Sequence, residues 1–329
     1  METNNNISLA HEYELRPLTF LAGGVLLILA IIAILSLRDD KRDNSIPTGQ
    51  ASESFPSITL QAKAAYVYDI RTGKVLFAHN EDKRLPLASL AKLMSALVAQ
   101  EIGFKHNTVT ITEAALDSDG DTGLLRDEKW SLEALLNFSL ISSSNDGIRA
   151  AALTLGALSR ADVSSEEIIS DFVGAMNQKA GEMGLKNTYF WNETGLDLPA
   201  QAGESNVKGG AYGSARDITA LMTHILNNYP EIFSMTREPV VNFTSLDNKV
   251  HIAKNTNDII YDIPGLLASK TGYTANAGGS LSIIFDPELG HPIAITVLGS
   301  TENGRFNDVR TLVNATLQFI ENSKLKIEN

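Results

Sequence analysis

The chain has 329 residues, of which 43% are hydrophobic, and this is enough apolar material for one large or two modest cores. Its 27 basic and 39 acidic residues give a net charge of -12, which opposes binding to nucleic acid. Without cysteine, the chain has no disulfide, thiol nucleophile or cysteine-based zinc site. The six histidines lack the spacing that aims two imidazoles at one metal, so we expect no metal and no other cofactor.

An uncharged apolar segment runs from Leu18 to Leu37, near the amino terminus. About 20 residues form a helix roughly 30 Å long, which matches the hydrocarbon thickness of a bilayer. A cleaved signal peptide is the alternative, but its apolar region is shorter, and Leu37 runs into Arg38 without a small-x-small cleavage site. We therefore expect a short tail over residues 1–17, a transmembrane helix over 18–37 and a polar linker over 38–61.

Residues 62–325 carry the pattern of one α/β domain. Apolar runs at Ala64–Ile70 and Lys74–His79 flank a Gly-containing turn and predict a β-hairpin. Leu281–Phe285 and Ile293–Leu298 predict a second hairpin near the end of the chain. This arrangement predicts an antiparallel sheet that is closed by the two ends of the domain.

The middle of the domain has a helical period. Apolar residues repeat at helical spacing in three segments, around Leu93, Leu135 and Phe172. We expect these helices to form a separate lobe, and a last helix, from about Phe306 to Asn322, to cover the sheet. A polar, Gly-rich stretch from Pro199 to Gly213 predicts a surface loop.

Ser89-Leu90-Ala91-Lys92 lies at the start of the first of these helices. Positions i and i+3 share a helix face, so the Ser89 hydroxyl and the Lys92 amine can approach within hydrogen-bond distance. Burial and a nearby cation favour the neutral amine, which alone can take a proton from serine. The motif by itself is weak, because an ordinary helix start is a common alternative and Ser205-Asn206-Val207-Lys208 is a second match.

Two further elements strengthen the first match. Ser143-Ser144-Asn145 falls between two predicted helices, where Ser143 alone could be a helix cap. Lys270-Thr271-Gly272 falls in a segment with strand character, where Lys270 alone could be an edge-strand charge. In this order, Ser-x-x-Lys, Ser-x-Asn and Lys-Thr-Gly form the set that is typical of penicillin-recognising serine enzymes.

From about Ala64 to Ile320 the chain resembles the D-alanyl-D-alanine carboxypeptidase family, the low-molecular-mass penicillin-binding proteins. Segments that resemble the family in order include Thr72-Gly73-Lys74, Leu185-Lys186-Asn187-Thr188, Thr194-Gly195-Leu196-Asp197, Ser214-Ala215-Arg216-Asp217 and Lys270-Thr271-Gly272-Tyr273-Thr274. The resemblance implies the penicillin-binding transpeptidase and serine β-lactamase-like α/β (α+β) fold. In this fold a five-stranded antiparallel sheet and a helical lobe flank the active site.

The resemblance also implies a role for each motif residue. Ser89 attacks the carbonyl of the penultimate D-Ala of a peptidoglycan stem peptide, and Lys92 is the base. Ser143 and Lys270 are expected to pass a proton to the leaving amine, and Asn145 to bind the peptide part of the substrate. Thr271 and Arg305 are expected to bind the terminal carboxylate. Gly272 is a further expected substrate-binding residue, and the N–H of Tyr273 is expected to stabilise the oxyanion. β-Lactams are the expected covalent inhibitors.

Three rival functions stay open on the sequence. A class A β-lactamase needs a glutamate that activates water, and neither Glu182 nor Glu193 has the expected Glu-x-x-Leu-Asn context. An endopeptidase of the same fold cuts cross-linked peptides, and no residue separates it from a carboxypeptidase. A β-lactam-binding sensor or inactive homologue is the third.

The expected substrate lies outside the bacterial cytoplasmic membrane, so the orientation of the predicted transmembrane helix decides whether the domain can reach it. Arg16 precedes the apolar segment, whereas Arg38, Lys41 and Arg42 follow it, so the positive-inside rule taken literally places the domain in the cytoplasm. Long domains can translocate despite such charges. We therefore expect a single-pass membrane protein with tail 1–17 in the cytoplasm and the catalytic domain outside.

Overall fold

The computed structural model describes residues 54–158, 163–199 and 207–325. The predicted tail, the predicted transmembrane helix, most of the 38–61 linker and Ser205 lie outside these ranges. Among the residues that are described, no helix is long and apolar enough to cross a bilayer.

A five-stranded antiparallel sheet forms one part of the domain, with the strand order β10-β11-β12-β1-β2. Its strands are β1 (Ala64–Asp69), β2 (Lys74–His79), β10 (Leu266–Thr274), β11 (Gly278–Phe285) and β12 (Ile293–Ser300). β1 pairs with β12 and so joins the first two strands to the last three. Both predicted hairpins, and the closure of the sheet by the two ends of the domain, are therefore confirmed. β10 is an edge strand, which leaves one of its sides available to the rest of the domain.

Helices cover both faces of this sheet. α8 (Gly304–Leu325) packs on β11 and β12, and α7 (Ala215–Asn228) packs on β12, β1 and β11. Neighbouring strand residues point to opposite faces, so Ile283 packs in the cluster with α8 while Ile284 packs in the cluster with α7. Because both faces are covered, all eight residues of β12 are buried.

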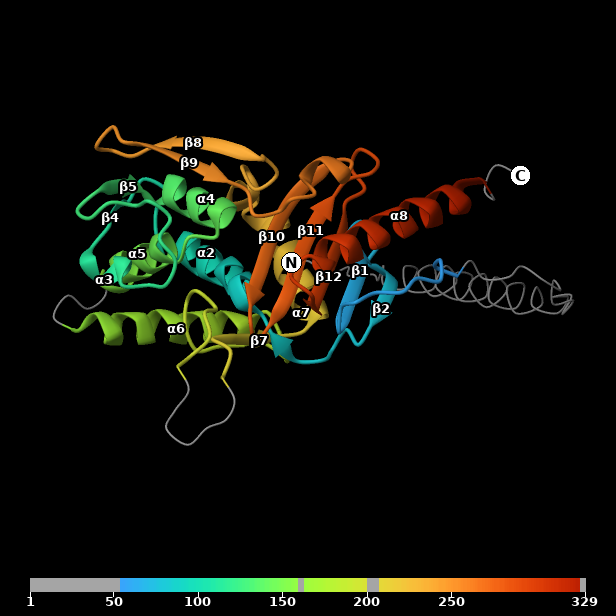
Figure 1. The fold of residues 1–329 in the computed structure, drawn as a ribbon, viewed down its shortest axis with the longest axis horizontal. Helices are drawn as coiled ribbons and strands as arrows, with labels where there is room; N and C mark the ends of the chain where they lie inside the picture. Colours follow the sequence, from blue (N-terminus) through green and yellow to red (C-terminus); the bar gives the residue numbers. More distant parts are fainter. Residues whose placement is uncertain (1–53, 159–162, 200–206, 326–329) are drawn as a thin grey trace, which may run out of the picture. The chain divides into compact units, whose positions relative to one another are not determined.

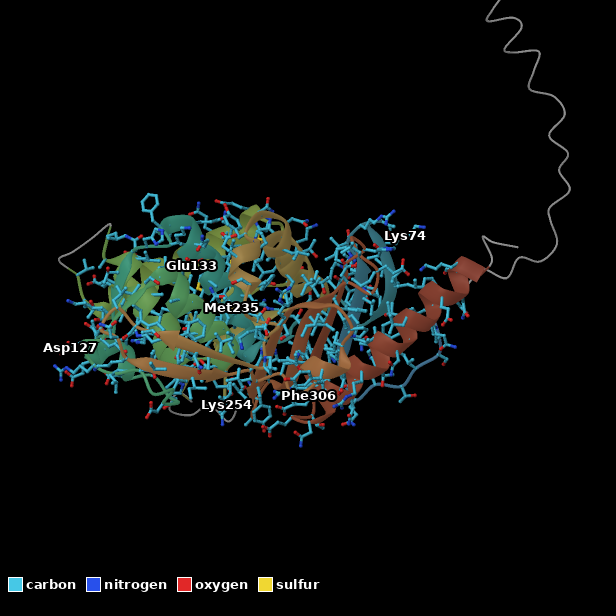
Figure 2. The ribbon with its side chains drawn as sticks, turned by 90° about the horizontal axis from the view of Figure 1, so that it is seen from above. Lys74, Asp127, Glu133, Met235, Lys254 and Phe306 are labelled. Atoms are coloured by element: carbon cyan, nitrogen blue, oxygen red, sulfur yellow. The ribbon has the colours of Figure 1, made fainter. Side chains whose placement is uncertain are left out.

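The helical lobe lies on the β10 side of the sheet (Figure 1). Its helices are α2 (Ala91–Ile102), α3 (Glu113–Leu116), α4 (Leu132–Ser142), α5 (Asn145–Gly156) and α6 (Ser165–Glu182). A β-hairpin of β8 (Val240–Thr244) and β9 (Val250–Lys254), which the sequence analysis did not predict, packs on α4. Figure 2 shows Lys74 of β2 and Asp127 of the lobe at opposite ends of the domain, with Met235 and Phe306 between them.

The predicted loop at 199–213 ends in a strand. β7 (Ala211–Gly213) pairs with β3 (Leu85–Pro86) and with β6 (Tyr189–Phe190). The prediction of a loop was therefore wrong for these three residues, because two or three residues are too few for an alternating pattern. β4 (Thr108–Thr110) and β5 (Lys129–Ser131) form another short pair, at the edge of the lobe.

Candidate active site

Ser89 lies in a short 3-10 turn, η1 (Ala88–Leu90), that leads directly into α2. The turn is held from both sides, because Leu87 and Leu90 are buried and the Leu87 N–H donates to the Ala211 carbonyl of β7 at 3.0 Å. Ala88 has a φ of 49°, in the left-handed region that non-glycine residues rarely adopt. The half-buried Ser89 side chain is thus presented by a backbone that the surrounding contacts constrain.

Lys92 lies one helical turn after Ser89 and is fully buried. Its Nζ donates to Ser89 Oγ at 2.8 Å and to the Thr194 carbonyl at 3.0 Å. Burial lowers the pKa of the Lys92 amine to about 7, against the opposing effect of the Glu193 carboxylate. A substantial fraction of this amine is therefore neutral near neutral pH, and a neutral amine can accept the proton of Ser89.

Ser143 lies in the turn between α4 and α5, with a φ of 60°. The next residue, Ser144, caps α5 by accepting from the Gly147 N–H at 3.0 Å. Lys270, fully buried on β10, donates from Nζ to Ser143 Oγ at 2.9 Å and to the Thr271 carbonyl at 2.9 Å. Burial, followed by the charges of Lys92 and Arg305, holds the pKa of Lys270 well below its usual value.

The three motifs meet where β10 passes the Ser89 turn. A Cβ on Gly272 would lie 2.8 Å from the Leu87 carbonyl oxygen and 3.4 Å from Ala88 Cβ, so only glycine allows the strand to approach this closely. Because β10 contacts the η1 turn, Lys270 comes to the same site as Ser89 and Lys92, and the charge of Lys92 lowers the pKa of Lys270. The structure thus brings together Ser89, Lys92, Ser143 and Lys270 from the two parts of the domain.

Arg305 lies at the start of α8, beside β10. Its Nη1 donates to the Gly272 carbonyl at 2.9 Å, and its guanidinium lies 5.9 Å from the ring centre of Tyr273, which is half exposed. Burial lowers the pKa of the Arg305 guanidinium. Thr271 is buried on the same strand, and its hydroxyl hydrogen-bonds that of Thr256. A positive charge and a hydroxyl therefore lie along β10, where an anion would find both.

Asn145, the last motif residue, begins α5 and points toward the 117–127 loop. Its Nδ2 donates to the Asp119 carbonyl, and its Oδ1 is buried without a hydrogen-bond partner among the described residues. The amide is thus anchored at one end and leaves its acceptor oxygen unpaired.

The sequence analysis missed several positions that contact the motifs, among them Thr194 and Thr256. Thr194 accepts from Lys92 through its backbone carbonyl, which leaves no side-chain signal in the sequence. Thr256 contacts Thr271 but belongs to no recognisable motif. Of these two, only Thr194 had an indirect signal, because the family resemblance includes Thr194-Gly195-Leu196-Asp197. The second Ser-x-x-Lys match cannot be compared, since Ser205 lies outside the described residues.

Comparison with known proteins agrees with this geometry. The D-alanyl-D-alanine carboxypeptidase DacF of Bacillus subtilis is 32% identical over 270 residues, which cover 80% of this chain and 60% of DacF. DacA of Haemophilus influenzae, also named a D-alanyl-D-alanine carboxypeptidase, is 33% identical over 243 residues, 69% of this chain and 53% of DacA. The chain thus spans little more than half of these two relatives. The D-alanyl-D-alanine endopeptidase of Escherichia coli is 29% identical and is covered to 70%.

Solved structures give the same fold. A penicillin-binding protein of Listeria monocytogenes with cefotaxime bound superposes with a TM-score of 0.64 at 28% identity, over 79% of this chain and 98% of that one. A D-alanyl-D-alanine carboxypeptidase from Mycobacterium tuberculosis has a TM-score of 0.67 at 24% identity, over 81% and 95% of the two chains. The family model described as D-alanyl-D-alanine carboxypeptidase matches residues 49–300. The chain belongs to the D-alanyl-D-alanine carboxypeptidase family.

Proposed function

We propose that this chain is a serine D-alanyl-D-alanine carboxypeptidase that trims peptidoglycan stem peptides through an acyl-enzyme at Ser89. The observation that carries the proposal is the 2.8 Å contact from Lys92 Nζ to Ser89 Oγ at an amine whose pKa burial lowers to about 7. This pair supplies a nucleophile and a base that is partly neutral near neutral pH.

In the proposed reaction Lys92 takes the proton of Ser89, and Ser89 Oγ attacks the carbonyl of the penultimate D-Ala. The N–H groups of Ser89 and Tyr273 stabilise the negative charge on the tetrahedral oxygen. When the intermediate collapses, the C–N bond breaks, and the leaving amine receives a proton through Ser143, whose Oγ is hydrogen-bonded to Lys270. Water then hydrolyses the ester and restores Ser89.

The remaining motif residues bind the substrate in this proposal. Thr271 and Arg305 hold the terminal carboxylate, because a hydroxyl and a guanidinium lie together along β10. Asn145 binds the peptide part, and Gly272 allows the edge strand to lie against the Ser89 turn. β-Lactams carry a carboxylate beside a strained amide, so they fit the same groups and acylate Ser89.

An endopeptidase that acts on cross-linked peptides is the second candidate, favoured by the similarity to the Escherichia coli D-alanyl-D-alanine endopeptidase. The two candidates share the chemistry at Ser89 and differ in the group that follows the scissile bond. Release of D-Ala from a pentapeptide, compared with cleavage of a cross-linked dimer, separates them.

We propose, in addition, that residues 1–17 are a cytoplasmic tail, that 18–37 span the bacterial cytoplasmic membrane once, that 38–61 are a linker, and that 62–325 form the catalytic domain outside. The support is the uncharged run Leu18–Leu37 together with the location of peptidoglycan.

The acyl-enzyme is tested by intact mass and peptide mapping after benzylpenicillin treatment. We expect one adduct, on Ser89, that is released slowly, and D-Ala release from a pentapeptide in the untreated protein. Ser89→Ala removes both, whereas the control Ser205→Ala, at the second Ser-x-x-Lys match, retains both. Rapid drug turnover would identify a β-lactamase instead, and a folded protein without any adduct would refute the assignment.

A further inference from the structure

Glu193 is a buried acid next to the residue that holds Lys92. Its side chain is 1% exposed, and its Oε1 accepts from Arg149 Nη1 at 3.1 Å. Its other oxygen, Oε2, is buried and has no hydrogen-bond partner among the residues that the structure describes. A buried carboxylate with only half of its acceptors paired costs free energy of folding. Fold stability alone is therefore a weak reason for a charged group at this position.

Arg149 connects Glu193 to the helical lobe. It lies on α5 four residues after Asn145, and thus on the same helix face. Its Nε donates to the Ala114 carbonyl of α3 at 2.9 Å, while Nη1 contacts Glu193. The guanidinium is therefore fixed between α3, α5 and the 192–196 loop.

The 192–196 loop is fastened to the nucleophile. Gly195, with a φ of 82°, packs so closely that an added Cβ would lie 1.9 Å from the Ala88 carbonyl oxygen. Asn192 Oδ1 accepts from the Gly195 N–H at 2.7 Å, and Ser95 Oγ of α2 donates to the Glu193 carbonyl. These contacts set the Thr194 carbonyl 3.0 Å from Lys92 Nζ, and the Glu193 side chain leaves the same loop one residue earlier.

We propose that the Glu193–Arg149 ion pair is a positioning element for Lys92, in which Glu193 supplies negative charge close to the amine and Arg149 limits how strongly Lys92 feels it. The proposal deepens the proposed function and rests on acylation of Ser89 with Lys92 as its base. It assigns Glu193 no contact with substrate or with the deacylating water.

Several charged groups surround Lys92. The Glu193 carboxylate, on the loop whose Thr194 carbonyl accepts from Lys92, favours the ammonium, and Arg149 pairs with that carboxylate. Lys270 shares the site from β10, and Arg305 lowers the pKa of Lys270. Glu193→Gln removes the carboxylate and leaves the Arg149 charge unneutralised, and both changes favour the neutral amine. Arg149→Met leaves the Glu193 carboxylate uncompensated, which favours the ammonium. The two variants therefore have opposite effects on the Lys92 proton.

The test is the pH dependence of acylation of the full chain by benzylpenicillin, measured as a second-order rate constant from about pH 5 to 9. The wild-type rate should rise with pH around the pKa of Lys92, which is about 7. For Glu193→Gln we expect this rise at a pH lower by about half a unit or more. The rate at pH 6, expressed as a fraction of the plateau rate of the same protein, should then be about three times that of the wild type. For Arg149→Met we expect a shift toward higher pH.

Two controls separate this role from a structural one. Arg149→Lys keeps the positive charge and should keep the wild-type profile. Glu128→Gln removes a different buried carboxylate, 2.7 Å from His251 in the lobe, and should lower the melting temperature without moving the profile. If Glu193→Gln does not fold, Arg149→Met compared with Arg149→Lys carries the same test.

Profiles that stay in place, or that move in the same direction in both variants, would overturn the proposal. So would a Glu193→Gln protein that acylates with a wild-type profile and loses only deacylation, because Glu193 would then act on water. A wild-type chain that benzylpenicillin does not acylate refutes the proposed function itself, which is a distinct result.

Discussion

Two lysines in one site are both fully buried, and their neighbours give them different properties. Lys92 donates to Ser89 and to a backbone carbonyl and has the Glu193 carboxylate nearby, which partly offsets the effect of burial. For Lys270 the charges of Lys92 and Arg305 instead add to the effect of burial and lower its pKa further. The charge of Lys92 disfavours a second charge on Lys270. The proton lost by Ser89 thus has a nearby acceptor at neutral pH.

Removing the Lys92 amine tests its role as the base. We expect Lys92→Ala to slow acylation by benzylpenicillin by about two to four orders of magnitude, which is the usual contribution of a positioned general base. Lys92→Arg should not restore the rate, because a guanidinium stays protonated in this pH range. Stopped-flow or quenched acylation assays measure both rates. A Lys92→Ala rate within about tenfold of the wild type would show that another group takes the proton.

At the scale of single residues, the sequence predicts the motif residues better than it predicts the groups that contact them. Ser89 and Lys92 are three positions apart, so helix geometry alone predicts their contact. The Thr194 carbonyl reaches Lys92 across 102 positions of sequence, and the charge of Glu193 acts on Lys92 from the same distant loop. Backbone acceptors and long-range charges follow from the fold and have no local pattern, so sequence reasoning did not find them.

Among the elements, the 192–196 loop and the η1 turn form the tightest junction in the site. Gly195 combines a left-handed φ with a backbone approach to Ala88 that leaves no room for a side chain. Gly290, in the β11–β12 turn, has a nearly equal φ of 81° but nothing within 4 Å of an added Cβ. A side chain at either glycine would strain the backbone, but only a side chain at Gly195 would also collide with the turn that carries Ser89.

We expect Gly195→Ala to slow acylation by at least about tenfold, because the loop or the Ser89 turn must shift and a shift near 1 Å at a reacting group is costly. Gly290→Ala carries the same conformational cost, about 1–2 kcal/mol, and should acylate at the wild-type rate. Acylation rates and melting temperatures of both variants are the measurements. Equal rates in the two variants would mean that the close contact at Ala88 does not position Ser89.

The accuracy of the element predictions follows the length and regularity of each pattern. The hairpins at β1–β2 and β11–β12 were confirmed because mostly apolar segments stand out from the polar, Gly-containing or Pro-containing turns between them. The last helix, predicted from about Phe306 to Asn322, extends from Gly304 to Leu325, a normal error at helix ends. β7 and the β8–β9 hairpin were missed because β7 has three residues and the faces of β8 and β9 are largely exposed.

On the scale of the whole domain, the site forms only when the two ends of the chain segment meet. Ser89 follows the first hairpin, Lys270 lies on the edge strand near the end, and α8 brings Arg305 to the same edge. The edge strand β10 meets the η1 turn before α2, so the lobe and its leading turn supply Ser89, Lys92 and Ser143, and the sheet supplies Lys270. A family resemblance could predict this arrangement, whereas hydrophobic periodicity predicted only the sheet and the helices separately.

The proposed topology makes the last prediction, and the absence of cysteine in the chain makes it simple to test. Single cysteines can be placed at Leu289, which is fully exposed in the β11–β12 turn, and at Ser8 in the proposed tail. In spheroplasts we expect a membrane-impermeant maleimide to label Leu289→Cys at once, and to label Ser8→Cys only after lysis.

The positive-inside rule taken literally predicts the reverse, because three of the four flanking basic residues follow the apolar segment. Labelling of Ser8→Cys alone in intact spheroplasts would place the catalytic domain in the cytoplasm, away from peptidoglycan, and labelling of both before lysis would show that residues 18–37 do not span the membrane.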